Sequence, residues 1–195
     1  YTIYTKKRRF VTVHFENSPC ENFLPCLEFL PLLILNHLQD NMYSILNTLH
    51  SYNRYLLLAA LVFVLYRSIS GWMGKKPYQK ADNAAGAALT GFSHLQLLLG
   101  LILYAGLSPY TQSAFANMGA AMKDPMLRYF AVEHIAAMLI AWVMIQMGRS
   151  LSKKATDDNS KHRKTAIYTI IATVIIVATL AQKGLLFGTV ANMAG

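Results

Sequence analysis

The fold is decided by the stretch YLLLAALVFVLY, residues 55–66, which holds no charged side chain. The apolar segment around it runs from about Ile45 to Tyr66, with polar residues only near its start. A helix needs about 20 residues to cross the roughly 30 Å of hydrocarbon in a bilayer. The sequence therefore predicts a transmembrane helix here.

Three more segments of this kind follow, at about Ala84–Leu107, Met126–Met147 and Thr165–Gln182. The pair Asp124-Pro125 before the third is typical of a helix start. The alternating segments of about ten residues that membrane β-strands need are absent from the sequence. We therefore expect an all-α integral membrane protein, an antiparallel, up-down-up-down bundle of four transmembrane helices.

Composition and charge agree with a lipid environment. Hydrophobic residues make up 54% of the chain and charged residues 14%, whereas soluble domains carry about 25% charge. The net charge is +9, and the basic residues lie between the apolar segments rather than on one polar face. This distribution indicates a lipid bilayer as partner and no nucleic acid.

Basic residues in the connections predict the orientation. The first and third connections are rich in them, whereas the second holds only Lys123, with Arg128 just beyond. Connections rich in Lys and Arg stay in the cytoplasm. We expect connections one and three to be cytoplasmic and both termini to lie outside. The basic residues concerned are Lys75, Lys76, Lys80, Arg149, Lys153, Lys154, Lys161, Arg163 and Lys164.

The first 41 residues differ from the rest of the sequence. All nine methionines fall at or after Met42, and residue 1 is Tyr. We interpret residues 1–41 as a non-native or disordered leader and residues 42–195 as the four-helix transmembrane domain. Both cysteines, Cys20 and Cys26, lie in the leader, so residues 42–195 hold no disulfide, thiolate metal site or covalent haem motif.

Five of the polar side chains within the predicted spans are informative about function: His50, Arg54, His94, Glu133 and His134. A charged group at the centre of a membrane helix costs about 2.5–3.5 kcal/mol, so such groups normally face the bundle interior. Their positions along the helices form a band from the outer leaflet to mid-membrane, which predicts one polar site there. A structural ion pair between Arg54 and Glu133 is the alternative role for these two residues.

Haem fits this set of side chains. Imidazoles from two helices can ligate one haem iron, and Arg54 can neutralise the propionates. Similar depth favours His134 with His94, and the diagonal position of the first and third helices favours His134 with His50. Three ligating histidines would need a second haem, with His162 as a weak candidate ligand in the solvated third connection.

Two further hypotheses concern the surroundings of this site. Phe92, Met138 and Trp142 are candidates to line a porphyrin ring. Alternatively, the three histidines and Glu133 hold copper, zinc or iron directly.

Three stretches carry a resemblance to a known family: LHSYNRY at residues 49–55, SHLQLLLGLILY at residues 93–104, and Glu133-His134. From about Met42 onward, the chain resembles small bacterial four-helix membrane proteins labelled cytochrome b, and more distantly one half of haem A synthase. The resemblance implies b-type haem held by His50, His94 or His134. It also implies a bacterial inner membrane.

The function that we expect is electron transfer between a quinone pool and a partner such as a respiratory complex. Glu133 beside His134 can carry protons in such a reaction. No nucleophile motif or nucleotide-binding loop is present, which favours an electron carrier over a catalyst. The alternative is a non-catalytic small subunit or assembly factor of a larger membrane complex; a homodimer and a proton-coupled transporter are further hypotheses.

Overall fold

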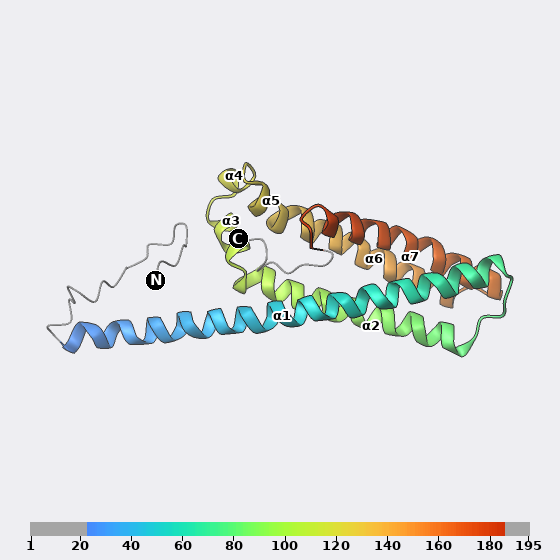
Figure 1. Cartoon of the computed structure of the whole chain (residues 1–195), viewed down its shortest axis with the longest axis horizontal. Helices are drawn as coiled ribbons and strands as arrows, with labels where there is room; N and C mark the ends of the chain where they lie inside the picture. Colours follow the sequence, from blue (N-terminus) through green and yellow to red (C-terminus); the bar gives the residue numbers. More distant parts are fainter. Residues whose placement is uncertain (1–22, 186–195) are drawn as a thin grey trace. The chain divides into compact units, whose positions relative to one another are not determined.

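The computed structural model describes residues 23–185, with side chains from residue 34, and all regular elements in this part of the chain are helices (Figure 1). The four long helices are α1 (Phe23–Met73), α2 (Lys80–Ile102), α6 (His134–Lys153) and α7 (Asp158–Ala181). Between α2 and α6 lie η1 (Leu103–Leu107), α3 (Pro109–Ala116), α4 (Met118–Ala121), α5 (Pro125–Arg128) and η2 (Tyr129–Glu133). The all-α prediction is confirmed for these residues.

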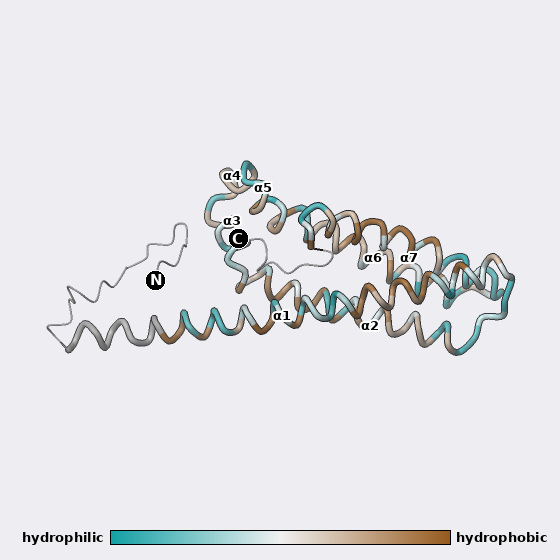
Figure 2. Tube along the Cα trace, viewed as in Figure 1, coloured by the Kyte–Doolittle hydropathy of each residue, from teal (hydrophilic) through white to brown (hydrophobic). Residues whose placement is uncertain are grey.

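Four helical segments are long and apolar enough to cross a membrane, and they coincide with the four predicted spans. They are Ile34–Met73, Lys80–Leu107, Pro125–Lys153 and Asp158–Ala181. Each is longer than the apolar stretch that predicted it, because the helices continue through polar residues at their ends. Figure 2 shows this as brown middle stretches and teal ends on α6 and α7.

The start of α7 also differs from the prediction. Asp157 caps this helix by accepting a 2.8 Å hydrogen bond from the Ser160 backbone N–H. Hydrogen bonds from Ser160 lower the pKa of the Asp157 carboxyl below its ordinary value. The helix therefore begins at Asp158 rather than near Thr165. The residues expected in a solvated connection, Lys161 to Lys164, are helical.

The chain divides into two compact units, Tyr1–Asp40 and Asn41–Gly195. The boundary lies beside Met42, where the predicted leader ends. Helix α1 begins at Phe23, so part of the predicted leader is helical, while residues 1–22 lie outside the described residues. Whether the leader is native stays a hypothesis.

The core of the second unit lies between the four long helices. Leu61 and Ala172 are fully buried there, and Ile145 is nearly so. Helix α6 packs along both α7 and α2. The contact with α7 requires Gly148, because a Cβ at this position would lie only 2.8 Å from the Tyr168 Cβ. Glycine allows the two backbones to approach closely, as in many membrane bundles.

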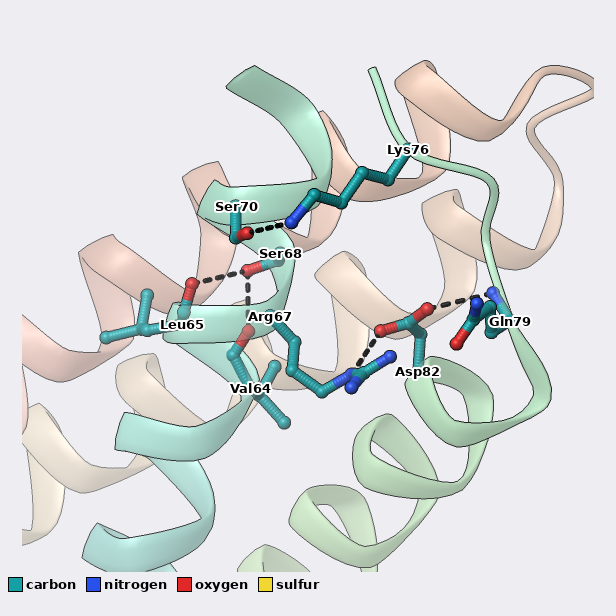
Figure 3. Close-up of polar contacts among 8 residues, drawn as sticks. All are labelled: Val64, Leu65, Arg67, Ser68, Ser70, Lys76, Gln79 and Asp82. Atoms are coloured by element: carbon teal, nitrogen blue, oxygen red, sulfur yellow. Dashed lines mark hydrogen bonds and ion pairs between the residues drawn. The ribbon is translucent and has the colours of Figure 1, made fainter. Parts of the chain in front are cut away.

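Residues 67–82 and 148–164 form one end of the bundle, here called the basic end. Polar contacts there join α1 to α2 (Figure 3). The Arg67 Nε donates to the Asp82 carboxylate at 2.5 Å. Asp82 also accepts the Gln79 backbone N–H at 2.8 Å, at the first turn of α2. One buried carboxylate thus joins the last turns of α1 to the start of α2.

Residues 108–128 form a small helical layer at the other end of the bundle, here called the cap. Its own core consists of Ala114 and Ala121, packed with Ala131 and Leu127. Thr111 ties the cap to η1 by donating its hydroxyl to the Tyr104 carbonyl at 3.0 Å. The cap is therefore packed against the helix ends that it joins.

Candidate functional site

A cavity of about 140 Å³ lies between α1, α2, α6 and the cap, and polar side chains from all of these line it. Its wall includes His50 and Arg54 of α1 and His134 of α6. Other polar and aromatic lining residues are Tyr43, Asn47, Ser93, Gln96, Tyr104, Tyr110, Thr111, Phe130 and Trp142. The cavity therefore brings together three of the five predicted site residues.

His50 is held by α2 on two sides. The Gln96 amide nitrogen lies 3.1 Å from the His50 Nε2 and also donates to the His50 backbone carbonyl at 3.1 Å. On the other side, a Cβ at Gly100 would lie 3.2 Å from the His50 Cε1. Among residues 34–185, the His50 Nδ1 has no hydrogen-bond partner. One imidazole nitrogen is thus engaged and the other is not.

His134 begins α6, directly after the π-helical turn η2. Its ring lies 5.6 Å from the Tyr129 ring and 6.4 Å from the Phe130 ring. Tyr129 is fully buried, and its hydroxyl donates to the Thr179 carbonyl at 2.9 Å. This turn is therefore anchored to α7, which fixes the position of His134 at the start of α6. Within the described part of the chain, the His134 Nδ1 is buried and without a partner.

A second π-helical turn, η1, faces the first. The Tyr104 hydroxyl of η1 donates to the Ala131 carbonyl of η2 at 2.8 Å. A π turn contains an extra residue that interrupts the α-helical hydrogen bonds, and such turns occur often at functional sites. Both turns border the cavity, since Tyr104 and Phe130 line it.

Arg54 lies one turn after His50 on the same face of α1, as its i,i+4 spacing predicts. It is 7% exposed, donates to the Tyr55 hydroxyl at 3.2 Å and lies 4.9 Å from the centre of the Tyr55 ring. The ion pairs among the described residues do not include one between Arg54 and Glu133. Glu133 instead accepts from the Arg128 Nε at 2.7 Å, and both side chains are more than a third exposed.

The structure separates His94 from the other histidines. His94 is exposed on α2 and does not line the cavity. Its Nδ1 lies 2.8 Å from the Thr90 carbonyl, one turn earlier, and its ring meets Trp142 edge-on at 5.5 Å. Of the two predicted pairs, only His50 with His134 shares a cavity.

The expectation of a solvated His162 is wrong. His162 is 2% exposed on α7, and its ring lies 5.0 Å from the ring of Tyr78. A Cβ at Gly71 would lie 2.4 Å from this imidazole, so only glycine leaves room for it. His162 lies at the basic end, apart from the cavity. Of the leader histidines, His37 is exposed on α1 and His14 lies outside the described residues.

A directly ligated metal centre is not found in the described part of the chain. No three His, Cys, Asp or Glu side chains gather there closely enough to hold an ion, so the four-ligand set with Glu133 does not form. Two of the predicted ring-lining residues, Met138 and Trp142, do line the cavity. Phe92 does not, although its backbone carbonyl accepts a hydrogen bond from Asn53 at 3.0 Å.

Asn53 is a site residue that sequence reasoning missed. It is 4% exposed on α1 and donates to the Gln96 side-chain oxygen at 2.7 Å. The available signal was its spacing: Asn53 lies three residues after His50, on the same helical face.

Comparisons with family models, curated proteins and solved structures found no match for this chain.

Proposed function

We propose that this chain is a membrane-spanning protein that binds b-type haem between α1, α2 and α6 and serves in electron transfer. One observation carries the proposal: His50 of α1 and His134 of α6 line the same cavity, and Arg54 lines it with them. Two imidazoles from different helices and one buried cation form the ligand set that this cofactor needs.

The chemistry of the donor atoms supports the proposal. Both imidazoles line the cavity, and the Nδ1 atom of each is buried and meets no partner among residues 34–185. Taking a polar ring out of water is costly, and a bond from each imidazole to iron would offset part of that cost. His50 and His134 would hold the iron, and Arg54 would neutralise a propionate. Haem would supply one-electron redox chemistry when bound.

The volume of the cavity sets a condition on binding. Its 140 Å³ is close to that of an engineered cavity that holds benzene, about 150 Å³. A porphyrin is several times larger, so binding requires the walls to separate. The cap is the wall that can yield most readily, because its own apolar core is only a few alanines and Leu127.

The proposed placement in the membrane follows from the four candidate spans. Joined by three connections, they would alternate in direction as an antiparallel bundle with both termini outside. The basic end would lie in the cytoplasm and the cap outside, at a bacterial inner membrane. The cavity would then lie in the outer half, where a quinol or a respiratory complex can exchange electrons with it.

A reduced-minus-oxidised visible spectrum of the full-length, detergent-purified protein tests the proposal. We expect a sharp α-band, as a six-coordinate b-type haem gives. We also expect His134→Ala and His50→Ala each to abolish this band, since each removes one of the two imidazoles that would hold the iron. A folded but colourless preparation from haem-supplemented cells would refute the proposal.

His94→Ala is the matched control, because His94 is also an intramembrane histidine but lies outside the cavity. We expect this variant to keep the α-band. Loss of the band in His94→Ala, with its retention in His50→Ala, would instead assign the second ligand to His94.

A further inference from the structure

A chain of hydrogen bonds from α2 through α1 fixes the orientation of one amide beside the cavity. The Phe92 backbone carbonyl only accepts, so the group of Asn53 that lies 3.0 Å from it must be the NH₂. That NH₂ also lies 2.7 Å from the Gln96 side chain, which must present its oxygen there. The Gln96 NH₂ is thereby directed away from Asn53.

His50 supplies an independent check of this orientation. The Gln96 nitrogen lies 3.1 Å from the His50 backbone carbonyl, which again can only accept. Both ends of the Gln96 side chain are therefore fixed by partners with one possible role. The same NH₂ lies 3.1 Å from the His50 Nε2, so this ring nitrogen accepts. A neutral imidazole that accepts at Nε2 carries its proton on Nδ1.

The other edge of the ring is limited by the next turn of α2. A Cβ at residue 100 would lie 3.2 Å from the His50 Cε1 and 3.7 Å from its Nδ1. Gln96 and Gly100 are four residues apart and share one face of α2. Gly100 thus leaves room for the imidazole that the Gln96 amide holds in one tautomer.

We propose that Gln96 is a positioning residue for His50, which it holds as the Nδ1–H tautomer by occupying the Nε2 lone pair. The inference rests on the proposed haem function. Because a lone pair serves one partner at a time, haem binding at Nε2 requires Gln96 to release its hydrogen bond. Gln96 and iron therefore compete for the same nitrogen.

Two measurements test this role. The first uses ¹⁵N-histidine-labelled haem-free protein at about pH 8, where an ordinary histidine is neutral; long-range ¹H–¹⁵N spectra report the tautomer. We expect the His50 signal, assigned by its loss in His50→Ala, to show the proton on Nδ1. A proton on Nε2 would overturn the inference, and this result needs no haem and no altered Gln96.

The second measurement is haem titration of Gln96→Met, which keeps the length of the side chain but removes the donor. A net hydrogen bond contributes about 1 kcal/mol, so its prior removal should raise haem affinity about fivefold. The haem-free variant should also lose the single His50 tautomer. Gln146→Met is the matched control, since Gln146 is an intramembrane glutamine on α6 that contacts Ser93 at 3.3 Å and does not line the cavity.

The outcomes separate the inference from the proposed function. Unchanged or weaker haem binding by Gln96→Met, or an equal gain in Gln146→Met, would overturn the competition between Gln96 and iron. Failure of the unaltered protein to bind haem, with the Nδ1–H tautomer present, would overturn the haem proposal while still supporting the hold of Gln96 on His50.

Discussion

Gln96 and His94 illustrate how much a helical rotation decides at the scale of single residues. An α-helix turns about 100° per residue, so two positions apart means opposite faces. Gln96 lines the cavity with Ser93, Leu97 and Gly100, at spacings of three and four residues. His94 is therefore directed outward. The sequence gives the depth of both residues, but the side on which the cavity lies depends on the neighbouring helices.

The outward position of His94 costs little free energy because one of its two ring nitrogens has a hydrogen-bond partner within α2. A backbone carbonyl only accepts, so the Nδ1 that lies 2.8 Å from the Thr90 oxygen must donate to it. Only the Nε2 lone pair remains for another partner. The assumption that a mid-membrane histidine must face the bundle interior overlooked this bond within α2.

The ion pair of Glu133 was missed for a related reason. Arg128 and Glu133 are five residues apart and lie at the two ends of the π turn η2. A regular α-helix brings residues four apart together, whereas a π turn joins residues five apart. α-Helical spacing therefore gives no reason to pair these two side chains.

Arg54 is the residue whose substitution should separate cofactor binding from folding. We expect Arg54→Leu to weaken haem binding roughly tenfold or more, because a charge-assisted bond of about 1.5–3 kcal/mol is lost. Arg54→Lys should retain part of the affinity, since the charge remains. Haem titration followed at the Soret band measures both.

Thermal unfolding of the haem-free proteins supplies the control for this pair of variants. A loss of affinity that is equal in Arg54→Leu and Arg54→Lys would contradict a role based on charge. It would point instead to the packing of the guanidinium against Tyr55.

At the scale of elements, the apolar centres of the helices are predictable and their ends are not. Apolar length marks each span, but a helix ends where its backbone groups find other partners. Asp157 was visible in the sequence as a candidate cap, and it places the start of α7 before His162. Recognising that cap would have moved His162 from the predicted connection onto a helix.

The two π turns could not be predicted from hydropathy. Each adds one residue to a turn without changing the apolar character of its segment, as in LYAGL of η1 and YFAVE of η2. Their pairing through Tyr104 and the Ala131 carbonyl involves residues 27 apart in sequence. Such a contact depends on how α2 and α6 are packed, which no local pattern reports.

The join between α1 and α2 gives a prediction at this scale. Arg67→Leu should lower the melting temperature of the detergent-purified protein by a few degrees, because the Asp82 carboxylate, 7% exposed, loses its cationic partner. Lys76→Leu is the control, since it removes an exposed hydrogen bond to Ser70 in the same region. Restoration of the melting temperature in the double variant Arg67→Leu/Asp82→Leu would confirm the coupling. Equal losses of melting temperature in Arg67→Leu and in the control Lys76→Leu would contradict it.

For the molecule as a whole, the distribution of charge sets a testable orientation. Single cysteines at Lys153, at the basic end, and at Met122, in the cap, are introduced after Cys20 and Cys26 are changed to serine. In intact bacterial spheroplasts, we expect a membrane-impermeant maleimide to label position 122 and to label position 153 only after lysis. The reverse pattern would contradict the proposed orientation.

The number and order of the four candidate spans were predictable, because each contains a long local run of apolar side chains. The cavity was predictable only in part. His50, Arg54 and His134 share it, as one polar site requires, but His94 and Glu133 do not. Depth along a helix is a local property, whereas convergence on one cavity is a property of the assembled bundle.

The cap also bears on how fast a bound molecule can leave. Tyr110 and Thr111 of α3 form part of the cavity wall, and Thr111 is fastened to the Tyr104 carbonyl. A molecule larger than the present space that enters past α3 would have to displace these residues on entry and again on departure. The lifetime of the complex would then be governed by the rate at which the cap opens. A cofactor bound during assembly would persist even where its equilibrium affinity is modest.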